Sequence, residues 1–214
     1  MKNGRYIAIE GPIGVGKTSL ANLLCDHYNG SLALEEPDDN PFLPDFYRDA
    51  ERWALETQLT FLLSRHRQQS KILQSDLFHQ TIIGDYIMEK DEIFARLNLN
   101  ERELNLYYTI AKNLIKSAPV PDVVVYLKAT PQRLMTNIKI RDIAYELYIE
   151  QSYLEDLCSS YNRFFRNWKS APILAVNTNE LDLIKNPDHL KVLIEYIDLL
   201  KEGKLKGLVE VSLD

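Results

Sequence analysis

Cysteine is scarce in this chain of 214 residues, and the two cysteines present, Cys25 and Cys158, are too few for a disulfide framework. Each falls in a stretch with helical spacing, where a lone cysteine usually behaves as a small buried hydrophobic residue. The four histidines are scattered, so the spacing of a four-ligand zinc site is also missing. These shortages argue against a disulfide-stapled domain and against a structural zinc site.

Long apolar runs and an excess of basic charge are missing as well. No run of 18 apolar residues occurs, so we expect no membrane span. Lys and Arg total 25 against 31 Asp and Glu, a net charge of −6, whereas a duplex-binding protein needs a basic stripe. Residues 1–5 lead straight into a strand-like run without a signal-peptide core. We therefore expect a cytoplasmic protein that binds neither nucleic acid nor a membrane.

Short apolar runs alternating with helical patterns predict the fold class. Five runs are mainly apolar and do not alternate with polar residues, as is typical of parallel strands buried on both faces: residues 6–9, 31–35, 81–85, 123–127 and 173–176. Helical spacing occupies residues 19–28, 51–78, 100–116, 149–168 and 189–201 and a stretch from residue 131. Residues 37–44 look turn-like, and the tail from residue 202 has no clear pattern. We expect a single α/β domain over residues 1–214, with a five-stranded parallel sheet and helices on both faces.

The clearest motif lies between the first strand and the first helix. Residues 11–18, GPIGVGKT, fit the pattern G-x-x-x-x-G-K-[ST] in full. Such a loop points successive backbone N–H groups at phosphate oxygens, while Lys17 reaches the β- and γ-phosphates and Thr18 offers a hydroxyl to Mg²⁺. The expected ATP contacts are Gly11, Ile13, Gly14, Val15, Gly16, Lys17, Thr18 and Ser19. The motif predicts a three-layer fold of the P-loop NTPase type, but it leaves the reaction open.

Two acidic residues at strand ends are candidates for the chemistry. Ligands of an open α/β sheet bind at the carboxyl ends of its strands. Glu36 could be the general base of a small-molecule kinase, or a solvated acid at a strand end. Asp85 could hold Mg²⁺ beside Thr18, or cap a helix. A GTPase is disfavoured because residues 177–179, NTN, lack the Lys and Asp of a guanine-specific loop.

Several further stretches occur in an order that is typical of one family. They are Glu36-Pro37, Glu51-Arg52-Trp53, Gln58, Ser64-Arg65, Asp91, Ile93-Phe94-Ala95, residues 127–131 (LKATP) and Tyr153-Leu154. With the opening run of residues 7–18, they make the chain resemble the deoxynucleoside kinases, most of all the bacterial purine deoxynucleoside kinases. The resemblance covers about residues 6–155. It implies phosphorylation of the 5′-hydroxyl of a deoxynucleoside by ATP and Mg²⁺, with deoxyadenosine or deoxyguanosine as the expected substrate.

The resemblance also implies roles for individual residues. Glu36 matches the base that deprotonates the 5′-hydroxyl. Gln58 matches the amide that contacts the nucleobase edge, although its spacing alone fits the polar face of a long helix. Phe94 matches the aromatic residue that stacks on the base, a position that core packing would also explain.

Two pairs of residues complete the expected substrate site. Arg65 and Asp91 match an ion pair that lines the base pocket of members accepting cytosine and purines, which argues against thymidine as the preferred substrate. Tyr47 and Glu146 match the pair that holds the 3′-hydroxyl of the sugar. Both pairs are implied by the resemblance rather than by spacing.

The chain departs from the family pattern in two places. Many members carry an arginine directly after the carboxylate of the third strand, whereas this chain has Tyr86, which can donate a hydrogen bond to substrate but supplies no charge. The lid segment, about residues 137–146, keeps Arg141 as a catalytic cation but has Asp142 and Ile143 where a glycine and a second arginine are usual. The chain is thus a slow kinase, a kinase with a shifted lid, or a weakly catalytic nucleotide-binding descendant.

Other functions stay open from the sequence. Another small-molecule P-loop kinase, such as a nucleoside monophosphate kinase, would need more clustered arginines than the second half of the chain has. A nucleotide sensor would bind ATP without forming product. The resemblance further implies a homodimer formed through the long helices near residues 51–78 and 101–116.

Overall fold

A parallel sheet organises the protein. The computed structural model describes residues 5–75, 81–116, 118–180 and 182–211. Within these residues the sheet has six strands in the order β2-β3-β1-β4-β5-β6, and all neighbouring pairs are parallel. The strands are β1 (Arg5–Glu10), β2 (Ser31–Ala33), β3 (Thr81–Gly84), β4 (Val123–Lys128), β5 (Ile173–Asn177) and β6 (Leu208–Val211). Because β1 lies between β3 and β4, the loop that follows β1 opens at the middle of the carboxyl edge.

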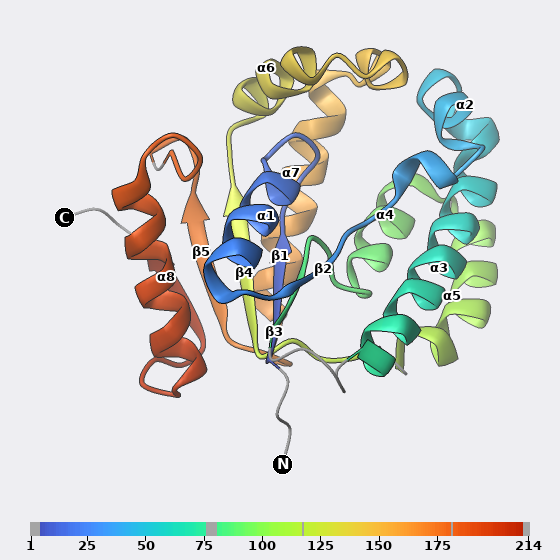
Figure 1. The fold of residues 1–214 in the computed structure, drawn as a ribbon. Coiled ribbons are helices and arrows are strands. Elements are labelled where there is room, and N and C mark those ends of the chain that lie inside the picture. Colours follow the sequence, from blue (N-terminus) through green and yellow to red (C-terminus); the bar gives the residue numbers. More distant parts are fainter. Residues whose placement is uncertain (1–4, 76–80, 117, 181, 212–214) are drawn as a thin grey trace.

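Helices cover both faces of this sheet. They are α1 (Lys17–Tyr28), α2 (Leu43–Arg48), α3 (Ala50–Ser75), α4 (Lys90–Asn98), α5 (Glu101–Lys116), α6 (Pro131–Arg141), α7 (Gln151–Asn167) and α8 (Pro187–Lys201), with 3-10 turns at Pro37–Asp39 and Ala144–Tyr148. Figure 1 shows α1 and α7 on opposite sides of the sheet, and α3 beside α5 at its right-hand end. None of the described helices is long and apolar enough to cross a membrane.

The predicted α/β class is confirmed, but the predicted number of strands is wrong. The sixth strand, β6, comes from the tail and pairs with β5 at the edge of the sheet. An edge strand is covered on fewer sides, so Leu208 and Glu210 are exposed and the apolar run that marks a buried strand is missing. The short helix α2 was also missed, because Pro44 suggested a turn although proline is tolerated in the first turn of a helix.

Local sequence signals explain the remaining elements. Ile7 and Ile9 of β1 are completely buried, as the apolar run predicted. The predicted cap of α5 is confirmed, since Asn100 Oδ1 accepts the Glu103 N–H at 3.1 Å while Glu103 Oε2 accepts the Asn100 N–H at 3.1 Å. The helix predicted over residues 51–78 is α3, and residues 76–78 lie outside the described residues. The helix α4 had no counterpart among the predicted elements.

Candidate active site

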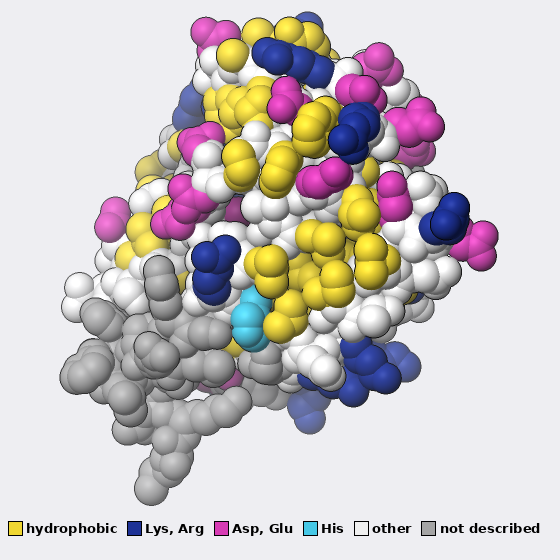
Figure 2. Space-filling model, turned by 90° about the vertical axis from the view of Figure 1, so that its right-hand side faces the viewer, with side chains coloured by type: hydrophobic (Ala, Val, Ile, Leu, Met, Phe, Trp, Pro, Cys, Tyr) yellow, Lys and Arg dark blue, Asp and Glu magenta, His cyan; other side chains and the backbone are white. Residues whose placement is uncertain are grey.

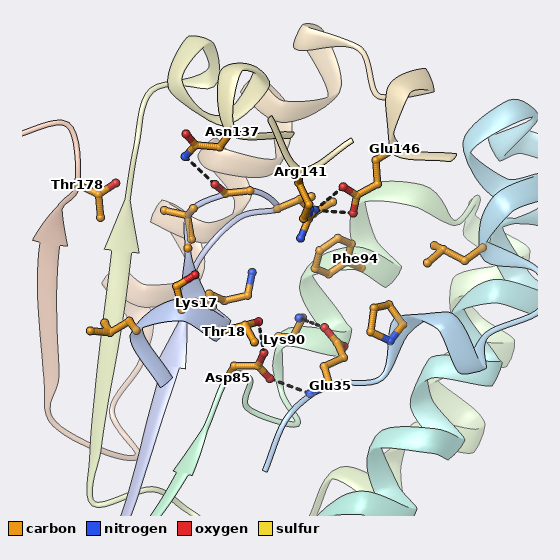
Figure 3. Close-up of a pocket in the computed structure, with 18 of the residues that line it drawn as sticks. Lys17, Thr18, Glu35, Asp85, Lys90, Phe94, Asn137, Arg141, Glu146 and Thr178 are labelled. Atoms are coloured by element: carbon orange, nitrogen blue, oxygen red, sulfur yellow. Dashed lines mark hydrogen bonds and ion pairs between the residues drawn. The ribbon is translucent and has the colours of Figure 1, made fainter. Parts of the chain in front are cut away.

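The carboxyl edge of the sheet opens into a cavity of about 680 Å³. Its lining comes from the loop after β1, the end of β3, and helices α2, α3, α4 and α6. Figure 3 shows the side chains of this lining converging from both sides. The predicted site residues in the lining are Ile13, Gly14, Val15, Gly16, Lys17, Thr18, Ser19, Tyr47, Gln58, Arg65, Asp85, Phe94, Arg141 and Glu146. The fold thus brings most of the predicted site together.

The loop after β1 requires glycine for steric reasons. Gly14 has φ +80°, and a Cβ there would lie 2.9 Å from Cγ1 of Ile138 on α6. A Cβ on Gly11 would lie 2.5 Å from the Leu127 carbonyl oxygen of β4. Asn137 of α6 donates to the Gly14 carbonyl at 2.8 Å. The loop is therefore packed tightly between the sheet and α6, with its backbone close to the cavity.

Lys17 is the cation of this loop. Its ammonium donates to the carbonyls of Gly11 at 2.8 Å and Pro12 at 3.1 Å. Burial lowers the pKa of Lys17 to about 8, and repulsion from Lys90 acts in the same direction. An anionic ligand would offset both effects, because a negative charge nearby favours the protonated amine.

Thr18 and Asp85 meet beside Lys17. The Thr18 hydroxyl donates to Asp85 Oδ2 at 2.6 Å, and Asp85 Oδ1 accepts the Glu35 N–H at 2.8 Å. These oxygen donors suit Mg²⁺, which is often held by one or two protein groups together with phosphates and water. The described residues contain no cluster of three or more His, Cys, Asp or Glu side chains that could hold a metal alone.

Two neighbouring glutamates at the end of β2 point in different directions. Glu36, the predicted base, is exposed and accepts a hydrogen bond from Gln68 Nε2 at 3.0 Å. Glu35 instead lines the cavity, where its carboxylate binds Arg65 at 2.6 Å and Lys90 at 2.7 Å. Burial raises the pKa of Glu35, but these two cations outweigh burial and hold the pKa well below its ordinary value. The carboxylate that faces the loop is therefore Glu35.

Arg65 joins two acids across the interior of the site. From α3 it donates both to Asp91 on α4 and, through Nε at 2.8 Å, to Glu35. Asp91 is completely buried, and Gln58 Nε2 donates to its backbone carbonyl at 2.9 Å. Arg65 and Asp91 thus form the ion pair that the resemblance implied, with Asp91 behind Arg65 and outside the cavity lining. Burial raises the pKa of Asp91, and Arg65 opposes that rise.

The lid segment closes the upper side of the cavity in Figure 3. Arg141, the last residue of α6, donates to both carboxylate oxygens of Glu146. Asp142 then ends the helix with φ +54°. Tyr47 of α2 stacks on Tyr145 with ring centroids 6.0 Å apart, so α2 packs against the segment that carries Glu146.

Tyr86 does not reach the cavity. Its ring is buried, and its hydroxyl donates to Gln68 Oε1 at 2.9 Å. Sequence reasoning missed Glu35 and Lys90 in the lining. Two adjacent acids cannot be told apart without the backbone direction, and a lysine usually lies on the surface. The aromatic side chain of Phe94, by contrast, lines the cavity as expected.

Comparison with known proteins places the chain in a family. The model of the family described as "Deoxynucleoside kinase" matches residues 7–200. The chain belongs to the deoxynucleoside kinase family.

Individual members of the deoxynucleoside kinase family align along most of the chain. A deoxyguanosine kinase of Bacillus subtilis is 34% identical over 193 residues, covering 87% of this chain and 92% of the relative. A deoxyadenosine kinase of Dictyostelium discoideum is 31% identical over 198 residues, which cover 90% of this chain and 78% of the relative. A solved deoxyadenosine kinase from M. mycoides, with the products dCMP and dCDP bound, shares the fold at a TM-score of 0.79 and 24% identity, covering 90% of this chain and 98% of that one.

Arg65 generates a prediction about the stability of this deoxynucleoside kinase. Arg65→Met leaves Glu35 and Asp91 in the interior without their shared cation, so we expect the free energy of unfolding to fall by about 3–5 kcal/mol. Arg52→Met on the same helix removes an exposed pair with Glu56 and should cost less than about 1 kcal/mol. Urea unfolding followed by circular dichroism measures both, and equal losses would contradict the role given to Arg65.

Proposed function

We propose that this protein transfers the γ-phosphoryl group of ATP to the 5′-hydroxyl of a deoxynucleoside. The observation that carries the proposal is the placement of Glu35 in the same cavity as Lys17 and Thr18 of the phosphate loop. A kinase needs such a carboxylate for the acceptor hydroxyl opposite a cradle for the donor phosphates. The names of the relatives, which include deoxyguanosine and deoxyadenosine kinases, support a purine deoxynucleoside as the acceptor.

Glu35 is the general base in this proposal. Its carboxylate stays ionised near neutral pH because Arg65 and Lys90 hold its pKa low. It accepts the proton of the 5′-hydroxyl as the 5′-oxygen bonds to the γ-phosphorus and the bond from that phosphorus to the β,γ-bridging oxygen breaks. ADP leaves, and the proton passes from Glu35 to solvent. Lys17 binds the β- and γ-phosphates, and Arg141 adds positive charge from the lid once substrate separates it from Glu146.

Four further lining residues bind the nucleoside. Phe94 offers a ring face for the base, and Gln58 offers an amide for its edge. Tyr47 and Glu146 lie where α2 meets the lid segment and bind the 3′-hydroxyl of the sugar.

The donor complex is ATP with Mg²⁺. Thr18 and Asp85 would hold the cation, which would neutralise part of the charge on the phosphates. A cytoplasmic location is part of the same proposal.

Glu35 and Glu36 provide a matched pair of variants. Glu35→Gln keeps the shape of the side chain but removes the base, so kcat should fall by at least about 10². Glu36→Gln changes an exposed neighbour and should leave kcat within about twofold. A steady-state assay with Mg²⁺·ATP measures both variants. A large loss in Glu36→Gln together with normal turnover in Glu35→Gln would contradict the assignment.

The same assay tests the reaction itself. Each of the four natural deoxynucleosides is offered to the wild-type protein, and Lys17→Ala serves as the blank because it removes the cation of the phosphate loop. We expect 5′-monophosphate from deoxyadenosine or deoxyguanosine. ATP binding without product from any of the four would overturn the kinase assignment and favour a nucleotide sensor.

A homodimer formed through α3 and α5 belongs to the proposal. Three large apolar side chains are exposed on these helices, Leu63 on α3 and Leu106 and Ile110 on α5. Figure 2 shows hydrophobic side chains gathered on this side of the molecule. Such a patch is a common mark of a protein interface.

The oligomeric state can be tested by mutation of this patch. The double substitution Leu106→Glu and Ile110→Glu places charge in the interface, so a dimer should become a monomer of 24.8 kDa. Leu208→Glu, at an exposed leucine on β6, is the control and should leave the mass unchanged. Sedimentation equilibrium gives the mass, and a wild-type protein that sediments as a monomer would overturn the proposed dimer.

A further inference from the structure

A buried lysine at the start of α4 has no role in the mechanism beyond holding Glu35. Lys90 is 3% exposed, although lysine is rarely buried to this degree. It is also the first residue of α4, where the helix dipole disfavours a cation. A residue that is unfavourable both in its burial and in its position on the helix often marks a functional site.

The side chain of Lys90 points into the cavity. Its ammonium donates to Glu35 Oε2 at 2.7 Å and lies 5.7 Å from the centre of the Phe94 ring. Figure 3 shows it between Thr18 and Glu35, on the side of the carboxylate that faces the phosphate loop. Lys90 therefore contacts the proposed base and lines the same cavity as the phosphate loop.

Two observations indicate that Lys90 does more than neutralise Glu35. Arg65 already binds the other carboxylate oxygen through both Nε and Nη2. Lys90 and Lys17 both line the cavity, so two ammonium groups face the same space. Fixed cations at the point where negative charge develops are an effective means of stabilising a transition state.

We propose that Lys90 is a catalytic residue whose ammonium binds the phosphoryl group while that group passes to the 5′-oxygen. The charge comes from α4, whereas Tyr86, directly after Asp85, is not part of the cavity lining. The inference rests on the proposed function, because it assumes that a phosphoryl group passes through this cavity.

Turnover of Lys90 variants is the first test. Lys90→Met keeps the length of the side chain without its charge, so kcat should fall by about 10² while KM for the deoxynucleoside changes less than about threefold. Lys90→Arg keeps the charge and should recover most of the lost kcat. Arg96→Met removes an exposed cation from the same helix and should leave kcat unchanged. Thermal unfolding confirms that each variant is folded.

Binding provides a second readout that does not depend on turnover. Titration calorimetry measures the affinities of a purine deoxynucleoside and of its 5′-monophosphate for the wild-type protein and for Lys90→Met. The variant should lose at least about tenfold in affinity for the monophosphate and keep its affinity for the nucleoside.

The outcomes separate this inference from the proposed function. Wild-type phosphorylation together with unchanged kcat and unchanged monophosphate binding in Lys90→Met would overturn the role of Lys90 alone. Failure of Lys90→Arg to recover kcat in a folded protein would also overturn it, because a charge-based role predicts recovery. A wild-type protein that binds neither the nucleoside nor its monophosphate would overturn the proposed function and this inference together.

Discussion

The carboxylate of Glu35, held between Arg65 and Lys90, is the interaction on which the site depends. Each partner comes from a different element, since Glu35 follows β2, Arg65 belongs to α3 and Lys90 begins α4. Burying a charged group costs free energy unless an opposite charge lies close to it. The segment after β2, α3 and α4 must therefore pack so that Glu35 contacts both Arg65 and Lys90. The same cluster joins the sheet to the helices that extend away from it. It therefore holds α3 and α4 to the segment that follows β2, at the wall of the cavity.

The sheet topology determines what this carboxylate faces. Because β1 lies at the centre of the sheet with β3 beside it, the loop after β1 and Asp85 after β3 emerge next to each other. The hydrogen bond from the Glu35 N–H to Asp85 then ties the end of β2 to the same point. Three strand ends thus bring the phosphate loop, the side-chain oxygens of Thr18 and Asp85, and the proposed base into one cavity. The charged groups that a phosphoryl transfer requires are therefore already in place in the folded protein, before substrate binds.

Much of this arrangement could be predicted from the sequence. The apolar runs predicted strands β1 to β5, including β2 at one edge of the sheet, and the glycine pattern located the phosphate loop, because both signals are local. The long-range pair of Arg65 and Asp91 was reached only through family resemblance. The sixth strand was missed because an edge strand need not be apolar throughout. The choice between Glu35 and Glu36 depends on the direction in which the chain leaves β2, which no residue pattern encodes. Lys90 escaped notice for a related reason, since burial of a lysine is decided by its tertiary partners.

In the proposed mechanism Glu35, rather than its neighbour Glu36, meets the acceptor hydroxyl. A crystal structure with a purine deoxynucleoside and a non-hydrolysable ATP analogue would test it most directly. We expect the 5′-oxygen of the nucleoside within about 3 Å of a Glu35 carboxylate oxygen, with the γ-phosphate on the opposite side of the 5′-oxygen. A 5′-oxygen bound to Glu36, or directed away from both glutamates and the phosphate loop, would contradict it.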